Sequence, residues 1–297
     1  MTEDAGAGYG PRSGAWDGSG LPPAAQARLA RGGSVRSSLL SVGGALGAEV
    51  VGLEPIGDVM GVIVEHVGSQ GLGCPHYGPG GTYRGGGTVV SGPRVTWPAL
   101  DHYAQALYRG YDTALARLTR EARWLGADGV VGVTFAVSSL GQGNREFVAL
   151  GTAVRAEVGA RPATPFTTLL GGGDTAKLLL SRWVPVAATV GLAVGIGHDN
   201  WASPLHVSVL RPNAEVPGFT DLVGSTREAR RKLDARGRVT GADGIVIELL
   251  TTQVHRLEPV QGHTDYVAES YLIGSSIAHV GGPHPVSARA LAVLPVA

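Results

Sequence analysis

A six-residue sequence occurs twice in this chain and constrains its fold more than any other feature. Gly-Ala-Asp-Gly-Val-Val spans residues 126–131, and Gly-Ala-Asp-Gly-Ile-Val spans residues 241–246. Each copy follows a polar segment with helical spacing and precedes a β-branched run. Gly126 and Gly241 suit the left-handed position after a last helical turn, and Asp-Gly suits the turn that follows. The sequence therefore predicts a helix end, a turn and a strand start in each of two tandem modules.

Other matching segments extend this repeat along the chain. Residues 37–40 align with residues 167–170 at an offset of 167 − 37 = 130. The hexamers align at 241 − 126 = 115, and the last predicted strands align at 274 − 151 = 123. The first offset also pairs Pro55 with Pro185 and Gly61 with Gly191. The offset changes within predicted loops, where a folded repeat tolerates insertions.

Each module reads as a short helix, a strand, a main helix and two more strands. The short helices are predicted at 45–51 and 174–181, and the first strands at 56–66 and 186–196. Apolar residues from Leu107 to Leu125 recur at helical spacing, and Gly141–Asn144 is a hairpin signal. We expect an α+β fold of two modules, each a small antiparallel sheet packed on one main helix. The other face of each sheet then needs a partner.

The composition of the chain suggests where the two domains begin and end. Residues 1–32 form a Gly/Pro/Ala-rich arm, which we expect to be disordered because it has few large apolar groups. The first domain is predicted at 33–158, a linker at 159–166 and the second domain at 167–280. Residues 281–297 form a proline-containing tail.

Charge and cysteine content limit the partners and the compartment. Lysine plus arginine equals aspartate plus glutamate, 24 against 24, so no overall field favours nucleic acid or a membrane. The single cysteine, Cys74, excludes an intrachain disulfide and fits a reducing compartment. The acidic N-terminus does not resemble a secretory signal. We therefore expect a cytoplasmic protein with no nucleic-acid or membrane partner, and the apolar run 184–197 is interpreted as a buried strand.

Several of these segments together resemble the YbjQ-like proteins, a family labelled as heavy-metal-binding domains. The resemblance rests on Glu121–Val133, on Gly151–Val154, and on Leu53–Gly57. In the second module it rests on Phe166–Leu170, and altogether it covers most of residues 37–280 in tandem form. It implies a dodecin-like subunit that assembles into a ring, usually described as a pentamer. Two domains in one chain would then need stacked rings, another ring size or a closed pseudo-dimer.

Cys74 and His76 are the candidate metal ligands. Thiolate and imidazole suit zinc or copper, so the candidate cofactor is a divalent or soft transition metal. His66 lies upstream and His102 downstream. The alternative is that a glycine-rich loop holds a cysteine and a histidine by chance, because no second cysteine and no repeated ligand spacing occur. Surface or loop positions are expected for six histidines that show no ligand spacing: His198, His206, His255, His263, His279 and His284.

Three further charged features have structural explanations. Glu248 aligns with Val133 of the first module. A β-bulge, or a strand face that is turned to solvent, is favoured there over a functional carboxylate at an inter-domain surface. Asp128 and Asp243 are expected to bond backbone groups near their turns. The basic run between Arg227 and Arg238 is interrupted by acids and lacks aromatic residues, so it is interpreted as a solvated helix face.

The sequence therefore predicts a non-enzymatic, homo-oligomeric protein that binds a metal ion or small ligand at inter-domain or inter-subunit surfaces. No catalytic residue is assigned, and no cofactor-binding residue is identified. The alternative is a structural or protein-interaction module without a ligand, with the N-terminal arm and Pro283–Ala297 as docking segments. An enzyme is the third reading, because no phosphate loop, nucleophile elbow or zinc-protease helix occurs.

Overall fold

The computed structural model describes residues 20–30, 38–68, 88–90, 98–159, 161–199, 215–260 and 263–281. The chain divides into two compact parts, Met1–Arg36 and Ser37–Ala297. The described residues of the first part contain α1 (Pro23–Ala30). All other described elements belong to the second part, where they form two modules.

The first module is a four-stranded sheet packed on a long helix. It comprises α2 (Val42–Val50), β1 (Leu53–His66), α3 (Pro98–Trp124), β3 (Gly129–Gly141) and β4 (Asn144–Ala156). The sheet order is β1-β4-β3-β5, where the short β5 (Phe166–Thr167) pairs in parallel with the start of β3. Strands β1 and β3 each pair with β4 in antiparallel orientation.

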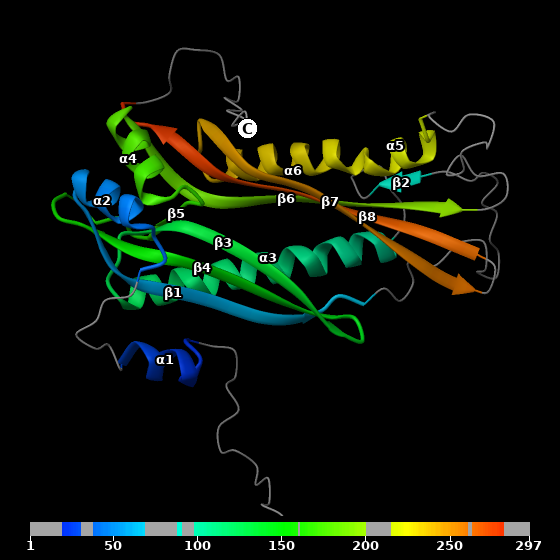
Figure 1. The fold of residues 1–297 in the computed structure, drawn as a ribbon, viewed down its shortest axis with the longest axis horizontal. Helices are drawn as coiled ribbons and strands as arrows, with labels where there is room; N and C mark the ends of the chain where they lie inside the picture. The colour runs from blue at the N-terminus through cyan, green and yellow to red at the C-terminus, as the bar shows by residue number, and fades with distance from the viewer. Residues whose placement is uncertain are drawn as a thin grey trace, which may run out of the picture. The chain divides into compact units, whose positions relative to one another are not determined.

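The second module has the same order of main elements. It comprises α4 (Gly172–Leu180), β6 (Trp183–Asp199), α5 (Pro217–Val223), α6 (Ser225–Val239), β7 (Gly244–Val260) and β8 (His263–His279). Its sheet order is β2-β6-β8-β7, and β2 (Thr88–Val90) comes from the excursion between β1 and α3. The predicted α+β fold of two tandem modules, each a sheet on a helix, is confirmed (Figure 1).

Both copies of the repeated hexamer end a helix in the same way. Gly126 and Gly241 have φ angles of 70° and 75°, in the region that favours glycine. Ala127 N–H donates to the carbonyl of Ala122 at 2.9 Å, and Ala242 N–H donates to that of Gly237 at 3.2 Å. Together with a bond from each glycine N–H to the carbonyl three residues earlier, these bonds form a Schellman motif. The predicted helix stop is confirmed at both positions.

Each sheet meets its own helix at a glycine. A Cβ on Gly61 would lie 1.8 Å from the carbonyl oxygen of Ala114 in α3. A Cβ on Gly191 would lie 2.3 Å from the carbonyl oxygen of Ala229 in α6. Only glycine permits this approach of strand backbone to helix backbone, because the close atoms are backbone atoms that cannot rotate away.

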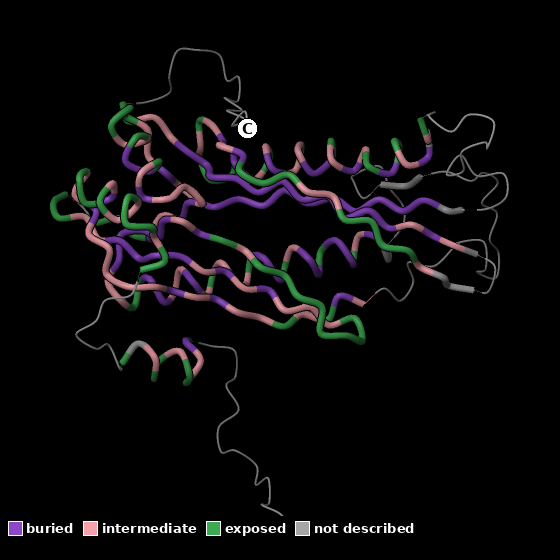
Figure 2. Tube along the Cα trace, in the orientation of Figure 1, coloured by how far each residue is buried: buried purple, intermediate pink, exposed green. Residues whose placement is uncertain are grey.

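Helix α3 lies between the two sheets (Figure 1). One face packs on β1 and β4, and the opposite face packs on β6, so one hydrophobic core contains residues of both modules. The hydroxyl of Tyr108 in α3 donates to the carbonyl of Leu192 at 3.0 Å and accepts from its N–H at 2.7 Å. Strands β6 and β8 are buried along most of their length, whereas the far end of β3 is exposed (Figure 2).

Three local details differ from the sequence-based expectations. Pro55 and Pro185 lie at register shifts within β1 and β6 instead of opening them, and the missing N–H is tolerated at such irregularities. The second main helix is divided at Gly224 into α5 and α6. Strand β2 was not expected, because its three residues lie in a glycine-rich excursion and pair with β6 over a hundred positions later.

Candidate functional site

A buried carboxylate lies where the two modules meet. Residues Val267, Glu269, Tyr271 and Ile273 alternate along β8 and share one side of the strand. Three of them are apolar or aromatic and belong to the core that α3 shares with both sheets. Glu269 is the fourth, and its side chain is 0% exposed. A fully buried carboxylate requires compensating charge and hydrogen bonds.

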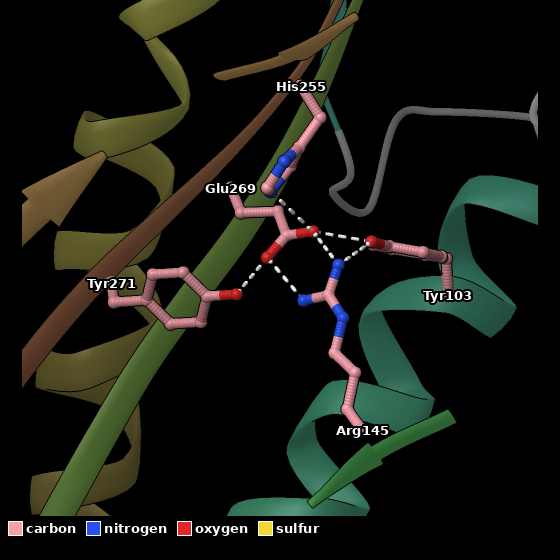
Figure 3. A network of polar contacts seen from close by, with 5 residues as sticks. All are labelled: Tyr103, Arg145, His255, Glu269 and Tyr271. Carbon is pink, nitrogen blue, oxygen red and sulfur yellow. Dashed lines mark hydrogen bonds and ion pairs between the residues drawn. The ribbon is translucent and has the colours of Figure 1, made fainter. Parts of the chain in front are cut away.

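Four side chains surround the carboxylate of Glu269 (Figure 3). The guanidinium of Arg145 donates one hydrogen bond of 2.7 Å to each carboxylate oxygen. The hydroxyls of Tyr103 and Tyr271 donate to Oε1 and Oε2, and Arg145 also donates to the Tyr103 hydroxyl at 2.6 Å. His255 Nε2 lies 3.5 Å from Oε1. Glu269 therefore accepts a bidentate arginine and two hydroxyl groups.

The network joins distant parts of the chain. Tyr103 lies in α3 and Arg145 at the start of β4, whereas His255 lies in β7 and Glu269 in β8. The β3–β4 hairpin places Arg145 opposite Ser139. Its turn residues Gln142 and Gly143 have φ angles of 53° and 75°, as the predicted tight hairpin requires. The first module thus supplies a cation to an anion of the second.

The network shifts the protonation equilibria of its members. Burial by itself raises the pKa of Glu269, but the hydrogen bonds from His255 and Arg145 and the charge of Arg145 outweigh it and hold this pKa well below its ordinary value. Burial and then the charge of Glu269 raise the pKa values of Tyr103 and Tyr271. Near neutral pH the carboxylate stays ionised and the phenols stay protonated, so these groups are suited to binding and not to proton transfer.

Two adjoining cavities lie beside this network, and we call them together the inter-module cleft. The larger has a volume of about 370 Å³ and the smaller about 210 Å³. Both are lined by Ser139, Arg145 and His255, which therefore mark their junction. The larger is bounded by β3 and β7 residues and by Tyr111, whose ring packs edge-on against Phe135 at 5.4 Å. Its size falls in the range of small-molecule sites.

Of the four residues considered for a metal site, His66 and His102 lie among the described residues. Cys74 and His76 lie outside them. His66 is exposed at the end of β1, where Nδ1 lies 2.9 Å from Asn144 Oδ1, and His102 is exposed on α3. Within the ranges that the structure describes, no group of three or more His, Cys, Asp or Glu side chains could hold a metal ion.

Glu248 occupies a β-bulge, as the sequence indicated. The β7–β8 register shifts between Ile247 and Leu249, which leaves Glu248 as the extra residue. The residue is exposed, but its carboxylate accepts a hydrogen bond of 3.2 Å from Ser275, and partial burial raises its pKa. Ser275 also accepts from Thr168, in the segment between the modules.

The turn acids bond backbone groups, as predicted, but across the sheet. Asp128 accepts from the N–H of Ala156 at 2.8 Å, and Asp243 accepts from that of His279 at 2.9 Å. Each acid therefore ties the turn to the end of the last strand of its own module.

None of the five residues of the Glu269 network was predicted as a site residue. One signal was present, since Glu269 is the single charged residue in an alternating row with Val267, Tyr271 and Ile273. Its cation could not be identified in this way, because Arg145 is 124 residues away. His255 was expected at a surface or loop position; it is exposed on strand β7, and it also lines the cleft.

The comparisons with known proteins bear on this architecture. Residues 98–157 match the family model YbjQ_1, described as "putative heavy-metal-binding". The chain is 31% identical to an encapsulin nanocompartment protein of Mycobacterium tuberculosis over 278 residues, which cover 91% of this chain and 95% of the relative. The chain belongs to the family of this mycobacterial protein.

Shorter relatives match this chain over about half of their own length. A UPF0145 protein of Thermus thermophilus is 45% identical over 58 residues, which cover 20% of this chain and 51% of the relative. A UPF0145 protein of Methanococcus maripaludis is 43% identical over 68 residues, covering 23% of this chain and 55% of the relative. No solved structure matches the chain.

These matches identify a YbjQ-like domain in the chain. The YbjQ match, at residues 98–157, lies in the first module, so the duplication stays a prediction, as do the proposed domain boundaries. Among the described residues, no helix is long and apolar enough to cross a membrane.

Proposed function

We propose that the chain is a non-enzymatic subunit of an oligomer and that it binds a small molecule in the inter-module cleft. One observation carries this proposal: a cavity with a volume of about 370 Å³ is lined by residues of both modules. Apolar and aromatic walls with a few convergent polar groups are the usual composition of a small-molecule site. The perturbed pKa values of Glu269 and its tyrosine partners point to the same place.

Native mass spectrometry of the full chain, purified without an affinity tag, tests this function. It reports the stoichiometry of the oligomer and any retained small molecule together. The matched variants are Ser139→Trp, which fills the junction of the two cavities, and Ser138→Trp, which adds the same bulk on the opposite face of β3. We expect a retained mass in the parent and in Ser138→Trp, and its loss in Ser139→Trp. A retained mass that is equal in all three would contradict the cleft as the site.

A second candidate is an interaction module of an encapsulin nanocompartment. The likeness to the mycobacterial nanocompartment protein favours it, because the match covers 95% of that relative. Co-expression with an encapsulin shell protein, followed by size-exclusion chromatography, tests it. We expect the full chain to elute with the shell and chains lacking residues 1–19 or 282–297 to elute apart from it. Separate elution of the full chain would count against this role.

A metal ion remains the alternative ligand, with Cys74 and His76 as its proposed ligands. The family description of the match at residues 98–157 supports it. Elemental analysis of untagged protein, beside the Cys74→Ala and His76→Ala variants, is the direct test. We expect a bound metal in the parent and its loss in both variants. No bound metal in the parent, and no stabilisation on adding zinc or copper, would contradict this version.

A further inference from the structure

The inter-module cleft has an apolar end and a polar centre. Tyr111, Phe135, Leu249 and Ile273 line the larger cavity. Arg145 and His255 lie where the two cavities adjoin. A molecule that fills the larger cavity would therefore place an apolar body against the aromatic rings and reach the two basic side chains with one end.

The acidic group of this site is not available to a cationic ligand. Glu269 is 0% exposed, and both of its oxygens accept hydrogen bonds from Arg145 and from tyrosine hydroxyls. A cation entering the cleft would have to displace the bidentate arginine, which is the strongest of these partners. The site therefore disfavours an amine or a guanidinium as the ligand head.

The groups that face the cleft at its centre can still donate hydrogen bonds. Arg145 has five N–H groups, and three of them serve Glu269 and Tyr103. Two N–H groups remain beyond those bonds, and the side chain is 17% exposed. His255 is 44% exposed and lines both cavities, and beyond the Nε2 that faces Glu269 it has a second ring nitrogen, Nδ1. The hydroxyl of Ser139 is a third donor at the same junction.

We infer that the cleft binds a small organic carboxylate with an apolar body. Its carboxylate accepts hydrogen bonds from Arg145 and His255, and its body packs on Tyr111 and Phe135 in the larger cavity. Charge-assisted hydrogen bonds from a guanidinium to a carboxylate are about twice as strong as neutral ones, which favours the anion over a neutral acceptor of the same shape. This inference rests on the proposed small-molecule function and names the ligand class.

Isothermal titration calorimetry on the full chain tests the ligand class with matched probes. The pairs are 3-phenylpropionate with 3-phenylpropanamide, and octanoate with octanamide. Each pair shares a body and differs in the charge of its head. We expect at least one carboxylate to bind about tenfold more tightly than its amide, which is the size of one charge-assisted hydrogen bond.

Variants of the exposed cleft residues locate the binding. Replacement of Arg145 can unfold the chain, because Arg145 also holds the buried Glu269, so His255→Gln and Ser139→Trp are used instead. We expect His255→Gln to weaken the carboxylate several-fold and to leave the amide unchanged. We expect Ser139→Trp to weaken both by about tenfold or more, and Ser138→Trp to change neither.

The outcomes separate this inference from the function beneath it. Equal binding of carboxylate and amide, both blocked by Ser139→Trp, would overturn the ligand class and leave the small-molecule function in place. Carboxylate binding that Ser139→Trp does not weaken would overturn the location. No binding of any probe would overturn the carboxylate class, and together with no retained mass in native mass spectrometry it would count against the function as well.

Discussion

The last strands of the two modules carry a glutamate at the same aligned position, with opposite surroundings. The offset of 269 − 146 = 123 pairs Glu146 of β4 with Glu269 of β8. Glu146 lies partly exposed beside Val148 and Leu150, and Glu269 is fully buried beside Tyr271 and Ile273. The difference comes from what covers each sheet, because α3 and β4 of the first module lie over this face of the second.

Local sequence determines the turns, whereas packing between the two modules determines the site. Gly126 and Gly241 adopt nearly the same φ, although their surroundings differ. Glu146 and Glu269 have the same chemistry, but only Glu269 has a bidentate arginine supplied by the other module. The buried carboxylate of the second module therefore depends on both modules being packed together.

The largest expected effect comes from removing the charge of Glu269. Glu269→Gln leaves the cation of Arg145 uncompensated, and breaking a buried ion pair in this way lowers the free energy of unfolding by about 3–5 kcal/mol. Glu146→Gln is the matched control, and we expect a change within about 0.5 kcal/mol. Urea denaturation measures both. Equal losses at the two positions would show that burial does not distinguish them.

Lowering the pH should reduce the difference in the free energy of unfolding between the parent and Glu269→Gln. Burial raises the pKa of Glu269, but the lowering by His255 and Arg145 is larger. The folded pKa therefore lies below the unfolded value of about 4.3. The stability from this group is fully present above the unfolded pKa and is lost as pH falls toward the folded pKa. Denaturation at a series of pH values from 7 to 3 measures it. A gap that stays constant over this range would contradict the shift.

The two strand glycines should be comparably intolerant of a side chain. Gly61→Ala and Gly191→Ala each force a Cβ against a helix carbonyl, at 1.8 Å and 2.3 Å, and we expect losses of about 2–3 kcal/mol or more. Gly57→Ala is the control on β1, because its Cβ would meet only Leu125 Cδ1 at 3.6 Å. Thermal denaturation ranks the three. A large loss at Gly61 with none at Gly191 would break the equivalence of the modules.

Substituting the two turn acids should lower the free energy of unfolding by modestly different amounts, with the larger loss at the more buried Asp128. Asp128 is 4% exposed, and its loss leaves the N–H of Ala156 without this acceptor, which costs about 1–3 kcal/mol. Asp243 is exposed, so water replaces its bond to His279 and we expect a loss of about 0.5–1 kcal/mol. Chemical denaturation of Asp128→Ala and Asp243→Ala compares them. A larger effect at Asp243 would contradict this order.

The features that sequence could predict are those governed by near neighbours. The Schellman ends at Gly126 and Gly241, the hairpin at Gln142 and Gly143, and the bulge at Glu248 follow from a few consecutive residues and their alignment. Each depends on backbone conformations that glycine or a bulge permits, so local composition is enough to indicate it.

The candidate site depends instead on contacts between distant segments. Tyr103 reaches Glu269 across 166 positions and Arg145 reaches it across 124. Nothing in the sequence around Arg145 shows that α3 would lie between the two sheets. Nor does it show that the start of β4 would contact the second module. The alternating row with Glu269 at one position gave a signal for a buried carboxylate, but it did not name the partners.

The short strand β2 has a consequence for the order of events during synthesis. Thr88–Val90 is made 195 − 90 = 105 residues before Gly195, where its partner segment in β6 begins. At about 5–20 residues per second, β2 leaves the ribosome roughly 5–20 s before it can pair. When the sheet of the first module forms, β2 therefore still lacks its pairing partner in β6. We expect β2 to join the second sheet only after β6 has been synthesised. The packing of the two modules against each other would then form late, in a single step.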